Sequence, residues 1–310
     1  MGDMKRNSRY NKEGKGRPVS SSAVVRLIIW SIVLCLLVGV FSLAMLLEWG
    51  SENMFRIHRY DYDDEGYSVG NGSTDALVTD IAIDWVAGSV TLLAVDGEEV
   101  RVIEDYDGQK EAHRLRWRVQ KGELSVKYCR PAIFGGVDTG SKNLTVEIPR
   151  SMLEGLTDIN VSAVSAVQNI SLSARELEIR TVSGRVDVKG DYSSLDVETV
   201  SGAVNFDGSF REGSLNGVSG AWTIRLREQA DELDMETVSG GMRVILPKET
   251  SGFHIDAESV SGNVDVRGFD KVYHSSEYHG ANSWGDGRME ISMESVSGKL
   301  TVEVEDEADD

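Results

Sequence analysis

Cysteine, proline and helical periodicity are all scarce in this chain. Its 310 residues include two cysteines and four prolines, against 32 glycines. Cys35 lies in a hydrophobic run and Cys129 stands alone in the remainder, so we expect no disulfide between them and a fold that is stable without one. Cys129 is expected to be a small buried side chain. No window from 79 to 302 repeats its apolar residues with a helical period, which argues against a helical domain there.

Positive charge is scarce outside the first 26 residues. The chain carries a net charge of −19, but residues 1–26 hold seven Lys and Arg against two acidic residues, a charge of +5. The −19 of the whole chain less this +5 leaves −24 on the rest. A body of this charge repels phosphate, so nucleic acid is not an expected partner.

Residues 27–47 form the one long hydrophobic run. Its 21 uncharged positions, at about 1.5 Å per residue, match the roughly 30 Å of a bilayer core. The basic head 1–26 precedes it, so we expect a single-pass membrane protein with its N-terminus in the cytoplasm and the rest outside the cell membrane. A signal peptide cleaved near 42–44 is the alternative, although the run is longer than usual for one. The head orients the helix, and contact with anionic lipid or a cytoplasmic partner is its second interpretation.

The remainder divides into three parts by composition. Residues 48–78 are polar, acidic and glycine-spaced, which is typical of a stalk or linker. Residues 79–304 are a succession of short segments in which apolar and polar residues alternate, as in "DIAIDWVAGSVTLLAV" at 80–95. Alternation with a period of two predicts strands, so this extracytoplasmic domain is expected to be all-β. Residues 305–310 form a solvated acidic tail.

One tripeptide, Val-Ser-Gly, recurs six times, and its serines are separated by 18, 18, 20, 22 and 36 residues. A step near 18 indicates stacked units that cannot bury a face alone, and it predicts a β-solenoid. Looser copies place Ser165 and Ala87 at the serine position of earlier units. The six repeat corners are Ser183 and Gly184, Ser201 and Gly202, Ser219 and Gly220, Ser239 and Gly240, Ser261 and Gly262, and Ser297 and Gly298.

The apolar residues change parity at each tripeptide. Counting the serine as position 0, apolar residues fill −6 and −4 before it, and +3 and +5 after it. Side chains alternate along a strand, so this change predicts a corner or bulge just before the serine. Glycine at +1 is expected to face inward just past the bend, where only glycine fits and takes positive φ.

The serine at position 0 is then expected to point outward. Its hydroxyl can satisfy backbone groups that the corner leaves free. A second interpretation is a polar ladder, with serines about 4.8 Å apart, that holds a linear polymer.

Three other architectures fit less well. A flat antiparallel meander would need tight hairpins, which "KGD" or "DGS" could supply. Calcium-binding rolls also use 18-residue coils, but here no Asp holds a fixed place in the turn. A six-residue left-handed helix requires an aliphatic residue at every sixth position, and polar segments such as "DGSFRE" break that rule.

The 36-residue step contains an insertion, 270–287, that gathers aromatic and histidine side chains. Such residues in a loop on a rigid scaffold are typical of recognition, and rings stack on sugars. The insertion is also expected to cap the last core layer. A metal site from His274, Glu277 and His279 follows no known spacing. The candidate partner-binding residues are Tyr273, His274, Tyr278, His279 and Trp284.

No constellation in the sequence indicates an enzyme. Carboxylates are so frequent that pairs of them discriminate nothing, and no Ser-His-Asp order is suggested. We therefore expect no catalytic residue, no cofactor, no bound metal and no small-molecule substrate.

The "VSGxVxV" units, the strand "LTVEIP" at 144–149 and the closing segment "GDGRMEISMESVSGKLTV" at 285–302 together resemble a known family. They resemble the bacterial β-strand-repeat proteins called putative adhesins, a domain of unknown function, over about 79–304. The resemblance implies a surface-exposed or membrane-tethered β-solenoid and supplies no catalytic residues. We expect an adhesin-like binding or scaffold module at the cell envelope, whose partner is an envelope glycan or a membrane protein. The alternative is an envelope-sensing or regulatory membrane protein of a stress-signalling system.

Overall fold

The computed structural model describes residues 62–106, 108, 110–131, 140–268, 273–275 and 279–305. Within these residues, no helix is long and apolar enough to cross a bilayer. The basic head 1–26 and the hydrophobic run 27–47 lie outside them. The membrane segment, its alternative as a cleaved signal peptide and the location of the chain therefore stay predictions.

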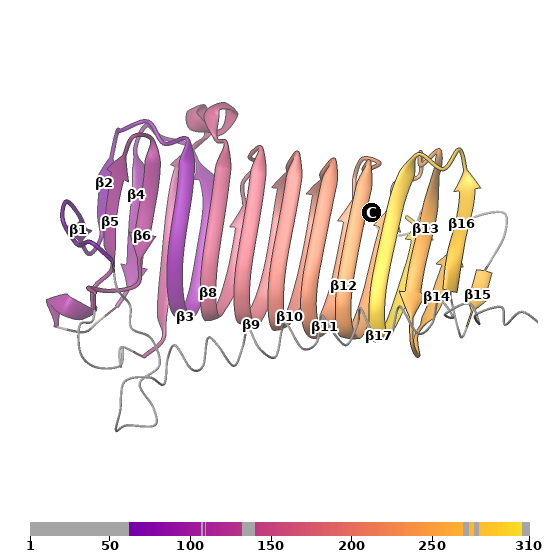
Figure 1. Cartoon of the computed structure of the whole chain (residues 1–310). Coiled ribbons are helices and arrows are strands. Elements are labelled where there is room, and N and C mark those ends of the chain that lie inside the picture. Colours follow the sequence, from indigo (N-terminus) through magenta and orange to yellow (C-terminus); the bar gives the residue numbers. More distant parts are fainter. Residues whose placement is uncertain are drawn as a thin grey trace, which may run out of the picture.

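Most of the described chain is β-strand, and 17 strands in it form one hydrogen-bonded sheet (Figure 1). The two short 3-10 helices are η1 (Glu111–His113) and η2 (Arg150–Gly155). The first strands are β1 (Ser68–Val69), β2 (Gly72–Thr74), β3 (Asp80–Val95), β4 (Val100–Asp105), β5 (Arg116–Gln120), β6 (Glu123–Lys127), β7 (Lys142–Pro149) and β8 (Asp158–Ser171). The others are β9 (Glu176–Asp191), β10 (Ser194–Ser209), β11 (Glu212–Leu226), β12 (Glu232–Leu246), β13 (Gly252–Ser259), β14 (Asn263–Arg267), β15 (Tyr273–Ser275), β16 (His279–Gly285) and β17 (Met289–Val304).

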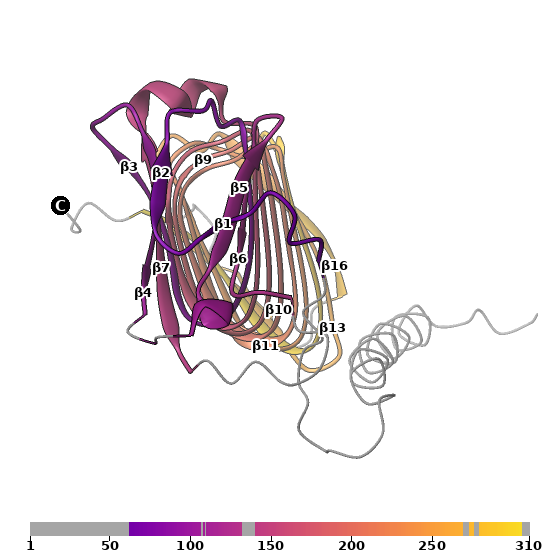
Figure 2. The ribbon, with the colours of Figure 1, turned by 90° about the vertical axis from the view of Figure 1, so that its left-hand side faces the viewer.

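The long strands stack in parallel, one coil on the next, as the 18-residue step predicts. Ser201 of β10 pairs with Ser183 of β9 and with Ser219 of β11, so the tripeptides lie side by side. The looser copies align too, with Ser165 on Ser183 and Ala87 on Ser165. Each strand bends at its middle, and the view along the stack shows the coils as nested loops (Figure 2). The architecture is solenoid-like, and the flat antiparallel meander is wrong.

Both ends of the stack depart from chain order. β3 lies between β8 and a split coil made of β6 and β7. At the other end β17 lies between β12 and a split coil made of β13 and β14. The long interval before Ser297 therefore arises because the chain builds the terminal coil first and then returns inside it.

Antiparallel strands close the two split coils. β5 and β4 pair with β6 and β7, and short strands β1 and β2 pair with them in turn. At the far end β16 pairs with β13, and β15 pairs with β14. We call these ends the N-cap (β1, β2, β4, β5, β6, β7) and the C-cap (β13, β14, β15, β16). Caps of this kind shield backbone groups that an open edge would offer to other chains.

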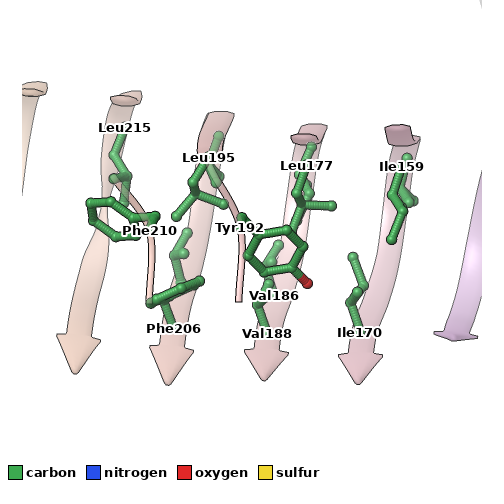
Figure 3. Close-up of a cluster of buried hydrophobic side chains, with 14 of the residues drawn as sticks. Ile159, Ile170, Leu177, Val186, Val188, Tyr192, Leu195, Phe206, Phe210 and Leu215 are labelled. Atoms are coloured by element: carbon green, nitrogen blue, oxygen red, sulfur yellow. The ribbon is translucent and has the colours of Figure 1, made fainter. Parts of the chain in front are cut away.

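The interior is built from the predicted parity. In β10, Leu195, Val197, Val204 and Phe206 are buried, whereas Asp196, Glu198 and Asn205 are at least partly exposed. Equivalent side chains of neighbouring coils stack into continuous rows (Figure 3). Each fully buried aliphatic or aromatic side chain contributes roughly 1.5–3 kcal/mol, so a coil becomes stable only when its neighbours cover it.

The glycine of the corner is explained by the neighbouring coil rather than by φ alone. A Cβ on Gly202 would lie 2.4 Å from the carbonyl oxygen of Gly184, and one on Gly220 would lie 2.1 Å from that of Gly202. Among the corner glycines, only Gly184, Gly220 and Gly240 have positive φ. The predicted requirement for glycine is right, but its main cause is close approach along the stack.

The folded unit begins earlier than the sequence suggests. Strands β1 and β2 fall inside the segment interpreted as a stalk, and Val78 is fully buried in the core. The boundary at residue 79 is therefore wrong for the structured part. Short strands with exposed side chains carry almost no hydrophobic period, which is why the alternation did not reveal them.

Candidate interaction surfaces

The repeat corners form a ridge along one side of the stack. The predicted outward serines are exposed or half-buried, and two hydroxyls bond to backbone: Ser183 Oγ donates to Val164 O and Ser261 Oγ to Val296 O, both at 3.4 Å. These contacts join adjacent coils. They support the structural role of the serines, while the polymer-binding ladder has no observation in its favour.

A second hydroxyl row lies inside five of the six corners, two residues before the serine, and Gly217 takes this position in β11. Thr181, Thr237, Ser259 and Ser295 are all buried there. Thr181 Oγ1 donates to its own corner carbonyl, Ser183 O, at 3.1 Å, and Ser259 and Ser295 bond to each other at 2.9 Å. The side chains of this row are small and polar because larger ones could not fit inside the bend.

Of the five candidate loop residues, the structure describes the side chain of Trp284 alone. Its ring stacks on the buried Phe253 with centroids 5.0 Å apart, and the residue is half-buried. Trp284 thus covers the end of the core, as predicted for a cap. Tyr273, His274 and His279 are described as backbone in β15 and β16, and Tyr278 lies outside the described residues. Partner binding by this loop stays a prediction.

The outer surface has two faces of different charge, one on each side of the corner ridge. The acidic face consists of the outward positions before the corner, across β6, β3, β8 to β12, β17 and β13. It carries sixteen carboxylates against two cationic side chains, Lys127 and Arg180. The carboxylates are Asp80, Asp84, Glu123, Asp158, Glu176, Glu178, Asp196, Glu198, Glu212, Glu232, Asp234, Glu236, Asp256, Glu258, Glu290 and Glu294.

The balanced face consists of the outward positions after the corner, on β9 to β12, β17 and β14. It carries five carboxylates and six cations. Several of these are paired, for example Arg185 with Asp187 at 2.7 Å, and Arg243 with Glu303. The net charge of the solenoid is therefore concentrated on one side.

Four carboxyl groups of the acidic face have raised pKa values, and neighbouring carboxylates contribute to each shift. Burial, followed by the charges of neighbouring carboxylates, raises the pKa of Asp158, Asp196 and Glu294. The charge of Asp234, with burial and Glu290, raises the pKa of Glu232. Each of these groups lies about 4.8 Å from the coil on either side, close enough for like charges to interact.

The described acidic residues do not converge. In the ranges that the structure describes, no group of three or more His, Cys, Asp or Glu is arranged to hold a metal ion. The side chains of His274, Glu277 and His279 lie outside the described part of the chain. The metal site that the composition suggested therefore stays a hypothesis.

Sequence reasoning missed a buried polar cluster in the N-cap. Lys142 is fully buried, and its Nζ lies 3.0 Å from Glu104 Oε2 and 4.1 Å from the ring centroid of Tyr128. The amide of Leu115 donates to both oxygens of Glu104. Burial lowers the pKa of Lys142 and Glu104 opposes that shift. Lys142 has the same parity in β7 as the buried Leu144 and Val146, so the alternation places it inside, but its charge made it look like a surface residue.

Cys129 neighbours this cluster and is buried and free, as expected of a small structural side chain. Burial raises the pKa of its thiol to about 11. A thiol with such a pKa is almost entirely protonated near neutral pH and reacts slowly.

These features define a class: a capped, solenoid-like all-β protein with long exposed faces. The family model for Toastrack DUF4097 matches residues 107–303, more than half of the chain, and the chain belongs to this family. The predicted resemblance to β-strand-repeat proteins named as putative adhesins is thereby confirmed. No curated protein matches the chain.

Solved structures with similar folds carry adhesion names. A putative cell adhesion protein from Clostridium sporogenes is 14% identical, with 77% of this chain and 100% of that chain covered and a TM-score of 0.28. A putative adhesin from Bacteroides fragilis is 11% identical, with 76% and 97% covered and a TM-score of 0.36. One from Parabacteroides distasonis is 10% identical, with 77% and 98% covered and a TM-score of 0.34. At these values the likenesses support no inference about ligands.

Proposed function

We propose that this protein is a membrane-anchored binding module that displays a stiff β rod outside the cytoplasm. The observation that carries the proposal is the polarity of the rod. The chain enters the described fold at the N-cap, and the aromatic-bearing insertion forms the C-cap at the opposite end (Figure 1). A tether at one end and a recognition loop at the other suit a scaffold that holds its contact surface away from the membrane. The proposed role is non-enzymatic.

The hydrophobic run 27–47 and the basic head support the anchor. Alkaline extraction of membranes should leave the full chain in the pellet, and protease added to right-side-out vesicles should digest residues 62–305. Release of the chain by alkali, or protection of that domain from protease, contradicts the anchored topology. A mature chain that starts near residue 45 would identify a cleaved signal peptide instead.

The proposed partner is an envelope glycan or a membrane protein that contacts the C-cap. We would replace Trp284 by a photoreactive phenylalanine analogue, which keeps an aromatic ring against Phe253, and irradiate native membranes. The matched control carries the same group at Leu77, which is 64% exposed near the opposite cap. Glycan adducts at position 284 support adhesion, and a discrete protein adduct supports a scaffold or sensor. Adduct yields equal to those at position 77 contradict partner binding by the C-cap.

An envelope-sensing role is the second candidate. It is favoured by one observation, the docking of chain from the tether side onto the N-cap, where Asp64 lies 3.3 Å from Arg116. Signalling through the membrane requires the cytoplasmic head, so replacing residues 1–26 by an unrelated basic sequence should abolish it. Display alone should survive that replacement.

A further inference from the structure

The N-cap gathers several cationic side chains in a small area. Four of them lie within β5, β6 and the residue stretch after β6, and we call them the basic patch: Arg116, Arg118, Lys127 and Arg130. Arg116 is buried, with 4% of its side chain exposed. A buried arginine needs a compensating anion, because an unpaired charge away from water is costly.

Residues 62–67, which we call the strap, lie across this patch. Asp64 supplies the nearest anion, with its Oδ1 3.3 Å from Arg116 Nε and its Oδ2 3.6 Å from Arg130 Nε. Glu111 Oε1, outside the strap, lies 3.9 Å from the guanidinium of Arg116. Neither Asp64 Oδ1 nor Arg116 Nε makes a hydrogen bond, so the contact between them is an ion pair alone. Asp64 is one-third exposed, so salt can screen this pair, although less than it screens a fully exposed one.

Aromatic contacts complete the docking. Arg118 lies 4.4 Å above the ring centroid of Tyr67 and donates to Glu65 O at 3.2 Å. Lys127 Nζ lies 5.7 Å from the ring centroid of Tyr62, and the two tyrosine rings meet edge to face at 5.2 Å. The strap is therefore recognised by side-chain chemistry, as a bound acidic and aromatic peptide would be.

The strap also contacts the residue that carries the only thiol of the described chain. The hydroxyl of Tyr62 donates to the carbonyl oxygen of Cys129 at 2.6 Å. Cys129 is 3% exposed, and the positive charges of Lys142 and Arg116 oppose the rise of its pKa. Removing the strap would bring water to this thiol while leaving the nearby cations in place, so its reactivity should increase.

From these contacts we propose that the strap is a reversible latch: residues 62–67 occupy in cis a peptide-binding site on the N-cap, and their release frees the rod from its tether. Freed, six residues add about 20 Å of reach at roughly 3.3–3.6 Å each. The consequence for display rests on the proposed membrane attachment, because only an anchored chain has a tether to lengthen.

The test is the rate at which maleimide labels Cys129 in the purified full-length chain, measured on its own peptide so that Cys35 does not interfere. D64N removes the strap's anion and should accelerate labelling about tenfold. D63N is the matched control, because the neighbouring Asp63 is exposed, its one bond in the described structure is local, from the amide of Glu65, and the charge change is identical. Raising the salt from 0.05 to 1 M should accelerate the wild type and D63N but not D64N. Y62F, which removes the bond to Cys129 O, should accelerate labelling severalfold.

Hydrogen exchange of β10, far along the stack, separates latch opening from unfolding. It should be the same in wild type and D64N; if β10 also loses protection, the variant has destabilised the whole fold and the latch is refuted. Equal labelling rates for wild type, D63N and D64N at every salt concentration refute it as well. A wild-type dimer that D64N dissociates would overturn the cis assignment, since the strap would then occupy a second copy. Labelling needs no membrane or partner, so its outcome is independent of the proposed function.

Discussion

Lys142 and Glu104 form a fully buried ion pair that joins β7 to β4 inside the N-cap, with Nζ and Oε2 3.0 Å apart. The same Nζ donates to His113 O at 2.8 Å and to Tyr128 O. Cys129 is the only cysteine in the described chain. The ion pair links two strands, a role that disulfides have in many small extracellular domains.

Removing one partner of this ion pair should destabilise the fold far more than removing both partners. K142M leaves the Glu104 carboxylate buried without its counter-charge, and we expect a loss of about 3–5 kcal/mol in the free energy of unfolding. The double variant K142M/E104Q removes both charges and should recover a large part of that loss. Urea unfolding of the wild type, K142M, E104Q and the double variant measures the cycle. If the double variant is as unstable as the sum of the single variants, the two residues act independently.

The corner glycines predict a second contrast. G202A places a Cβ 2.4 Å from Gly184 O, which forces adjacent coils apart, and should cost about 2–3 kcal/mol. Gly241 is the control, because a Cβ there meets nothing within 4 Å and its φ is not positive. G241A should be neutral or slightly stabilising, since alanine loses less backbone entropy than glycine. Thermal unfolding distinguishes them, and equal melting temperatures would argue against close approach as the reason for the motif.

The repeat made much of this fold predictable. A constant step and a parity change are local properties of the sequence. They were enough to place Leu195 and Val204 in the interior and Ser201 on the surface. The caps could not be placed, because β17 returns between β12 and β13 through pairings that span 36 and 58 residues. Lys142 was missed for a different reason, because its parity in β7 matches the buried Leu144 but its charge suggested the surface. A charged residue in an acidic chain looks like surface, and its burial depends on partners 38 and 14 residues away.

The acidic face predicts an unusual pH dependence. The pKa values of Asp158, Asp196, Glu232 and Glu294 are raised above the usual value near 4. The folded state therefore holds these protons at a pH where the unfolded chain has released them. Their destabilising effect is complete above the raised pKa values and disappears below about pH 4. Stability should accordingly rise as the pH falls from 7 through the raised pKa values towards 4, and added salt at pH 7 should act in the same direction.

E294Q tests this dependence at a single coil. The substitution removes one charge from a row that includes Glu236 and Glu258, so it should stabilise the protein at pH 7 and have little effect near pH 4. D207N on the balanced face is the control. Asp207 forms an ion pair with Arg227 at 3.1 Å, so removing its charge should not stabilise the protein. Denaturant midpoints at both pH values decide the matter. A wild-type stability that falls between pH 7 and 5, with no gain for E294Q, contradicts repulsion between coils.

The ring of Phe210 fills the space that a larger side chain at Gly213 would occupy. Substitutions at the two positions should therefore compensate for each other. Gly213 stands where most other coils have Leu or Ile, and a Cβ on it would lie 2.6 Å from the ring of the buried Phe210. F210A should therefore leave a cavity and cost about 3 kcal/mol, while G213L overpacks the same space and should cost about 2 kcal/mol. Together, F210A/G213L restores a leucine in the row of Leu195 and Leu233, and should cost less than F210A alone. Additive losses in the double variant would show that the ring and the glycine do not share one space.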